Sequence, residues 1–99
     1  MHYILDDNGT PVLENDLITW ARWFEDANNR RVAYDELPDG ITVSTVFLGL
    51  DHNFTGGTPI LYETMIFGGR CDEEQERYAT RDEALAGHAR MLALAKEEE

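Results

Sequence analysis

The sequence predicts an α+β domain in which an antiparallel sheet of about four to six strands carries two helices packed on one face. Short runs of β-branched and apolar residues are joined by turn residues, and a helix-periodic segment lies before and after them. Short turns between strands imply antiparallel pairing, which favours a two-layer sandwich. With 99 residues, 42% of them hydrophobic, the chain suits a single α+β domain over residues 1–99.

The first element is a predicted β-hairpin. His2–Leu5 and Thr10–Leu13 are short apolar runs on either side of Asp7-Asn8-Gly9. An Asn-Gly pair supplies the positive φ angles that a tight hairpin turn needs.

The segment Glu14–Asn29 is predicted to be a helix, and Asn15 or Asp16 can cap its start. Trp23 lies off the apolar stripe, so we expect this large aromatic to be covered by a subunit or ligand contact. The residues expected on the buried stripe are Leu17, Trp20, Ala21, Phe24 and Ala27.

Strands are predicted at Arg30–Leu37, Ile41–Leu48 and Ile60–Phe67, with a short last strand at Arg77–Ala79. The turn Pro38-Asp39-Gly40 joins the first two, because proline presets φ and glycine tolerates a positive φ. The second strand is apolar on both faces toward its end, which predicts a central position in the sheet.

The second helix is predicted to begin at a capping box and to run to about Lys96. The Thr80 hydroxyl can accept from the Glu83 amide while the Glu83 carboxylate reaches back to the Thr80 amide. The acidic end, Glu97–Glu99, is expected to fray, because negative charge opposes the helix dipole there. The predicted apolar stripe is Ala84, Leu85, His88, Met91, Leu92 and Ala95.

Two residues in the middle of this helix indicate close packing. His88 lies on the apolar stripe, where a lone histidine is expected to be a core residue hydrogen-bonded to a neighbour. Gly87 costs about 1 kcal/mol against alanine in a helix interior, so we expect another element to approach the helix closely there.

The charge argues against several classes of partner. Eight basic and twenty acidic residues give a net charge of −12, which repels phosphate backbones and makes a nucleic-acid polymer an unlikely ligand. The acidity favours solubility or attraction to a basic protein. Cys71 is the single cysteine, so no internal disulfide forms, which fits a reducing cytoplasm. Apolar runs long enough to span a membrane are absent from the sequence.

A polar loop between two predicted strands is the main candidate site. Asp51, His52, Asn53 and Phe54 offer a carboxylate, an imidazole, an amide and a stacking face within one turn. Such a set suits a small polar molecule such as a nucleotide. The same residues also suit a purely structural turn, because Asp and Asn close turns through their own backbone.

Glu63 alternates with apolar neighbours in a predicted strand, so it needs a partner if that face is buried. The candidate partners are Arg70, Arg77 and His52. The three histidines lack the spacing of metal ligands, and we predict no metal and no cofactor. The full predicted ligand-binding set is Asp51, His52, Asn53, Phe54, Glu63, Arg70 and Arg77.

Three stretches of the C-terminal half carry a resemblance: STVFLGLDH at Ser44–His52, PILYETM at Pro59–Met65, and RYAT…EA…GH within Arg77–His88. They resemble small uncharacterised accessory proteins of bacteriophages and prophages. The resemblance implies a protein made in the host bacterial cytoplasm. Small phage proteins of this kind often counter host defence, and one tactic is to sequester nucleotide immune signals in pockets between subunits.

These observations lead to three functional hypotheses. The first is a homo-oligomeric phage anti-defence protein that acts as a sponge, binding a small nucleotide-derived signal without catalysis. The second is a small hydrolase of such a signal that uses His52 with Asp51. The third is an inhibitor whose acidic surface binds a basic host defence protein.

Overall fold

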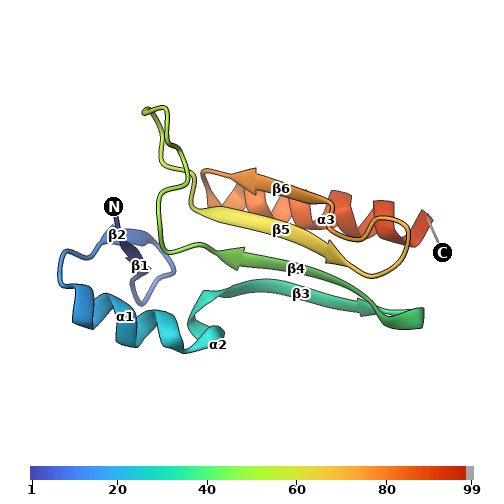
Figure 1. The fold of residues 1–99 in the computed structure, drawn as a ribbon, viewed down its shortest axis with the longest axis horizontal. Coiled ribbons are helices and arrows are strands. Elements are labelled where there is room, and N and C mark those ends of the chain that lie inside the picture. Colours follow the sequence, from blue (N-terminus) through green and yellow to red (C-terminus); the bar gives the residue numbers. More distant parts are fainter. Residues whose placement is uncertain (98–99) are drawn as a thin grey trace.

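The computed structural model describes residues 1–97 and confirms the α+β class (Figure 1). Four strands form one antiparallel sheet in the order β3-β4-β5-β6, and the N-terminal hairpin forms a separate two-stranded sheet. The strands are β1 (Tyr3–Leu5), β2 (Pro11–Leu13), β3 (Arg31–Leu37), β4 (Ile41–Phe47), β5 (Tyr62–Phe67) and β6 (Gln75–Tyr78). The helices are α1 (Leu17–Glu25), α2 (Ala27–Arg30), the 3-10 turn η1 (Pro38–Gly40) and α3 (Arg81–Glu97).

The strands of the larger sheet alternate between a buried face and an open face. On β4 the buried side chains are Ile41, Val43, Thr45 and Phe47. They pair with Ile66, Thr64 and Tyr62 of β5, which point the same way. The long helix α3 lies along this face (Figure 1), and its buried residues are Ala84, Gly87, His88, Met91 and Ala95. As predicted, β4 is a central strand.

The core under α3 consists of two apolar clusters with a polar row between them. Ile41, Val43, Ile66, Met91 and Ala95 form one cluster. Phe47, Leu61, Tyr62, Tyr78 and Ala84 form the other. The row between them contains Thr45, Thr64 and His88, which are all buried.

The predicted N-terminal helix is shorter than expected and broken at Asp26. Asp16 caps α1, as one of the two predicted caps. Asp26 has extended backbone angles and its carboxylate accepts from the Asn28 amide, so it ends α1 and begins the single turn of α2. Aspartate favours such caps over helix interiors because its short side chain bonds to nearby amides.

The buried face of α1 also differs from the predicted stripe. Trp20, Trp23 and Phe24 face inward, whereas Leu17 and Ala21 are exposed. Trp23, expected at a subunit or ligand contact, packs edge-on against Phe47 with the ring centres 5.7 Å apart. Through this contact α1 covers the end of the same sheet face as α3, so two helices pack on one face.

The two loops that connect β4 to β5 and β5 to β6 differ in shape. The first projects from the body of the molecule (Figure 1), and β5 begins at Tyr62 rather than at Ile60. The second turns back at Gly68, Gly69 and Glu73, which all have positive φ angles. Because this turn is tight, β6 begins at Gln75, before the predicted strand at Arg77–Ala79.

The capping box of α3 is confirmed. The Thr80 hydroxyl accepts from the Glu83 amide at 3.2 Å, and the Glu83 carboxylate accepts from the Thr80 amide at 3.1 Å. Glu97 is the last residue of α3, and the fraying expected at Glu98 and Glu99 lies outside the described residues. Within residues 1–97, no helix is both long and apolar enough to cross a membrane.

Gly87 permits the close approach that its helical position predicts. A Cβ atom at this position would lie 2.0 Å from the Tyr78 hydroxyl oxygen and 2.2 Å from the ring carbon that bears it. Tyr78 in turn donates a hydrogen bond from its hydroxyl to Glu76 at 2.8 Å, which holds the ring in place. Only glycine therefore lets α3 lie at this distance from β6.

We expect Gly87→Ala to lower the free energy of unfolding by about 1–3 kcal/mol, because overpacking outweighs the better helix propensity of alanine. Chemical denaturation monitored by circular dichroism measures this change. The control is Ala86→Gly on the exposed side of α3, which should cost about 1 kcal/mol from propensity alone. A Gly87→Ala protein more stable than the wild type would contradict the close contact.

Candidate functional site

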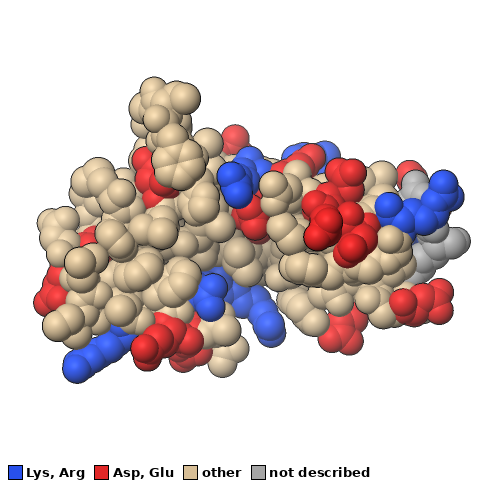
Figure 2. All heavy atoms as spheres, viewed as in Figure 1, with Lys and Arg blue, Asp and Glu red and all other residues tan. Residues whose placement is uncertain are grey.

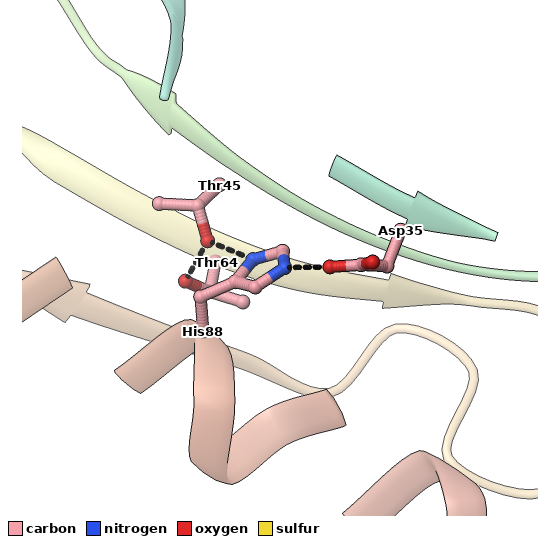
Figure 3. Close-up of polar contacts among 4 residues, drawn as sticks. All are labelled: Asp35, Thr45, Thr64 and His88. Carbon is pink, nitrogen blue, oxygen red and sulfur yellow. Dashed lines mark hydrogen bonds and ion pairs between the residues drawn. The ribbon is translucent and has the colours of Figure 1, made fainter. Parts of the chain in front are cut away.

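A chain of hydrogen bonds crosses the core from Thr64 to Asp35 (Figure 3). The Thr45 and Thr64 hydroxyl oxygens lie 2.5 Å apart, and Thr45 Oγ1 lies 2.7 Å from His88 Nδ1. On the other side of the ring, His88 Nε2 lies 2.7 Å from the Asp35 carboxylate. His88 is thus the hydrogen-bonded core residue that its place on the apolar stripe predicts.

One set of proton positions satisfies every member of this chain. In the tautomer that carries its proton on Nε2, His88 donates to Asp35 and its Nδ1 accepts from the Thr45 hydroxyl. Thr45 Oγ1 then accepts from the Thr64 hydroxyl. The order of acid, imidazole and hydroxyl resembles a nucleophilic triad. Thr45 and Thr64 are completely buried, however, and their hydroxyls are already hydrogen-bonded to each other and to His88, so we assign this row of side chains a structural role.

We expect Thr45→Val to lower the free energy of unfolding by about 1–3 kcal/mol, because it leaves Nδ1 of His88 without its partner in a buried site. Urea denaturation measures the loss. Thr42→Val is the matched control on the same strand, since Thr42 lies on the opposite face of the sheet. Equal stabilities of the two variants would contradict the structural role.

The predicted polar loop is closed largely by its own side chains. Asp51 Oδ1 accepts from the amides of Asn53 at 2.8 Å and Ile60 at 2.9 Å. Asn53 donates to the Thr58 carbonyl at 2.8 Å and accepts from the Thr55 hydroxyl at 2.9 Å. The structure therefore gives Asp51 and Asn53 the turn-closing bonds that are one of the two interpretations of this loop.

The tip of this loop presents an aromatic ring to solvent. Phe54 is 86% exposed, and its ring centre lies 6.1 Å from that of His52. Figure 2 shows the loop as a projection whose end carries no lysine, arginine, aspartate or glutamate. Exposed aromatic side chains of this kind are common among the residues by which a protein binds a partner.

The bonds to Asp51 predict a pH effect on the loop. Hydrogen bonds from the amides of Asn53 and then Ile60 hold the pKa of Asp51 below its usual value. Because the folded pKa is lowered, the stabilisation is present above the unfolded pKa of about 3.9 and is lost as the pH falls through the folded value. We expect the protection of the Asn53 and Ile60 amides from hydrogen exchange, relative to their intrinsic rates, to fall as the solution is acidified.

Asp51→Asn keeps an accepting oxygen but cannot titrate, so in this variant the dependence of amide exchange on acid should disappear after correction for intrinsic rates. Exchange measured by NMR provides the test. A wild-type loop whose protection is unchanged by acidification would show that Asp51 does not hold it.

The remaining predicted residues do not gather at the loop. Glu63 pairs with Arg77 across β5 and β6, with Oε2 and Nε 2.8 Å apart, so one of the three candidate partners is confirmed. Their side chains lie on the open face of the sheet. Arg70 lies in the β5–β6 turn, beyond the end of β5 opposite to Glu63. The structure thus distributes the predicted set over a loop, a sheet face and a turn.

A cleft of about 470 Å³ lies elsewhere, between the N-terminal hairpin and the start of α3. The hairpin turn forms one wall, and the junction of β6 with α3 forms the other. Tyr62 and Leu61, at the start of β5, form its base. Its lining residues are Tyr3, Asn8, Gly9, Thr10, Pro11, Leu61, Tyr62, Ala79, Thr80, Arg81 and Asp82. We call this the hairpin cleft.

Tyr62 is the unusual member of this lining. Its side chain is fully buried, and its hydroxyl has no hydrogen-bond partner within residues 1–97. Burial raises the pKa of this hydroxyl above its usual value, and the charge of Arg81 opposes the rise. Buried hydroxyls are normally paired, so the Tyr62 hydroxyl is an unsatisfied donor on a residue that lines the cleft.

Arg81 brings the only positive side chain among the residues that line the cleft. Its guanidinium lies across the hairpin turn, where a Cβ atom placed on Gly9 would be 4.0 Å from Nη1. Arg81 is exposed, so its donors are accessible to a ligand. Asn8, Thr10 and Asp82 add further polar groups, and Tyr3 and Pro11 add apolar surface.

Sequence reasoning did not identify this cleft, because its walls come from the two ends of the chain. One signal was present: strand alternation places Tyr62 on the face opposite to Glu63 and hence in the core, where a tyrosine hydroxyl needs a partner. Among residues 1–97, histidine, cysteine and acidic side chains nowhere form a cluster of three that could hold a metal ion.

Comparison with known proteins finds no matching family model and no significant match among curated proteins or solved structures. The function is therefore argued from the geometry of the chain.

Proposed function

We propose that this protein binds a small phosphate-bearing molecule of the nucleotide class in the hairpin cleft and releases it chemically unchanged. The observation that carries the proposal is that the exposed Arg81 and Tyr62, whose buried hydroxyl has no partner within residues 1–97, line the same cleft. Arg81 offers a fork of N–H donors to an anionic group, and the Tyr62 hydroxyl adds an O–H donor when the bound ligand opens the cleft to it. A guanidinium binds phosphate oxygens in a bidentate manner, which makes arginine well suited to this role.

The rest of the cleft suits the remaining parts of such a ligand. Its volume of about 470 Å³ lies within the range of small-molecule sites. Tyr3 and Pro11 offer apolar surface to a base, while Asn8, Thr10 and Asp82 offer hydrogen bonds to sugar hydroxyls or ring nitrogens. The lining includes no histidine or cysteine, and we assign its Asp82 carboxylate to hydrogen bonding of the ligand rather than to catalysis.

The resemblance to phage accessory proteins supplies a biological context for this proposal. In that context the ligand is a nucleotide-derived immune signal of the host bacterium, and the protein acts as an anti-defence sponge. A sponge lowers the free concentration of the signal by binding alone, so it needs tight binding and abundance rather than turnover.

The orphan hydroxyl predicts opposite effects of Tyr62→Phe on stability and on binding. Without ligand, the variant should be about 1 kcal/mol more stable than the wild type, because an unpaired buried hydroxyl is removed. Its affinity for a ligand should fall about tenfold or more, since one hydrogen bond to a charged group is lost. Denaturation curves and titration calorimetry measure the two effects separately.

The binding experiment is native mass spectrometry of the protein mixed with cyclic dinucleotides, ADP-ribose and adenosine monophosphate. We expect intact ligand mass on the wild type, reduced occupancy in Tyr62→Phe and loss of binding in Arg81→Gln. Arg22→Gln, an exposed arginine of α1 outside the cleft, is the matched control and should bind as the wild type does. Binding that persists in Arg81→Gln, or a ligand recovered with altered mass, would contradict the proposal.

A further inference from the structure

The face of the sheet opposite to α3 presents three rows of side chains, which the strand register defines. The first row is Arg31, Val46, Glu63 and Arg77, one from each strand. The second row is Tyr34, Ser44, Met65 and Gln75. The third row is Glu36, Thr42 and Phe67. We call these eleven residues the open face.

The open face is apolar in places where solvent reaches it. Tyr34 is 40% exposed and Phe67 is 47% exposed, and Val46 and Met65 are half-buried. Figure 1 looks onto this face, with α3 behind β5 and β6. An exposed set of large apolar side chains on one surface is typical of a protein contact.

The open face is also neutral in a strongly acidic chain. It carries two arginines and two glutamates, whereas the whole chain has a net charge of −12. Two copies of the chain repel each other over most of their surface, but not here. The local balance of charge therefore favours the open face as the contact surface between two copies of the chain.

Within the face, the charges at the two ends of β3 have opposite sign. Arg31 lies over the Tyr34 ring at 4.5 Å, and the Tyr34 hydroxyl donates to Glu36 at 2.9 Å. The three side chains therefore form one line along the strand, with a cation at one end and an anion at the other. A twofold axis across the middle of this line would bring Arg31 of each copy next to Glu36 of the other copy.

We propose that the open face binds the open face of a second copy of this chain, about a twofold axis that runs across the strands through the second row. This axis places Arg31 of each copy over Glu36 of the other and brings the two Met65 side chains together. A twofold axis along the strands would instead place Arg31 over Arg77 of the second copy. Like charges therefore exclude that alternative.

The area of the open face determines how tightly we expect two copies to bind each other. Four strands about 4.8 Å apart, with rows that span about 20 Å of strand, project roughly 400 Å² in each copy. This is about half of the roughly 800 Å² that each partner of a standard specific interface buries, and it falls in the range of weak and transient contacts. We expect a reversible dimer that dissociates on dilution through the micromolar range.

Sedimentation velocity over a dilution series tests the arrangement. Arg31→Glu and Glu36→Arg should each weaken self-association about tenfold or more, because each places two like-charged pairs in the homodimer. An equimolar mixture of the two variants should form a heterodimer, since both of its cross-copy pairs are complementary. Arg22→Glu, an exposed charge change outside the face, should associate as the wild type does.

A second variant separates this arrangement from pairing of two β3 edges, which would also bring Arg31 near Glu36. Met65→Glu on β5 should abolish face-to-face dimers and leave edge pairing intact, whereas Leu17→Glu on exposed α1 should change neither. A monomeric wild type at the highest concentration, a mixture that forms no heterodimer, or a dimeric Met65→Glu protein would overturn the proposal. Ligand binding at the hairpin cleft is measured independently of these outcomes.

Discussion

The position of α3 on the sheet depends on the contact at Gly87 and His88. Gly87 lets the helix approach Tyr78 to a distance that no side chain allows. At that distance His88 reaches between the strands and bonds to Thr45 and Asp35. A row of hydrogen-bonded side chains has fixed donor and acceptor directions, so it is satisfied at a single position of the helix on the sheet. Apolar surfaces can pack in several positions. The two apolar clusters on either side then pack around the position that the hydrogen bonds fix.

The same packing determines where the hairpin cleft and the open face lie. Because both helices cover one face of the sheet, the other face is left with exposed apolar and paired charged side chains. Because α3 begins directly after β6, its first residues lie against the N-terminal hairpin and close the cleft above Tyr62. The cleft and the open face are therefore consequences of one two-layer arrangement, at separate places on the surface.

The distribution of charge supports a division of roles between these surfaces. The chain has eight basic residues against twenty acidic ones, yet three of its arginines, Arg31, Arg77 and Arg81, belong to the open face or the cleft. Elsewhere acidic groups dominate, and their like charges repel other copies of the chain. In such a chain, a local balance of charge is more informative than the total.

Local patterns in the sequence predicted most of the helices and strands and several of their details. Periodicity and turn residues located the strands and α3, the Thr80–Glu83 capping box is present, and Gly87 and His88 are packed as their helical positions predicted. These are local features, because caps, turns and buried faces follow from neighbours along the chain.

Contacts between residues far apart in the sequence became visible in the folded chain alone. In the folded chain, Asp51 and Asn53 close a loop, and Glu63 pairs with Arg77. The first helix ends at Asp26, and Trp23 packs against Phe47. The fold also joins Tyr62, Arg81 and the hairpin turn into one cleft, although these segments are far apart in the sequence. Such contacts depend on how the elements pack in three dimensions, and the local pattern of one chain does not encode that directly.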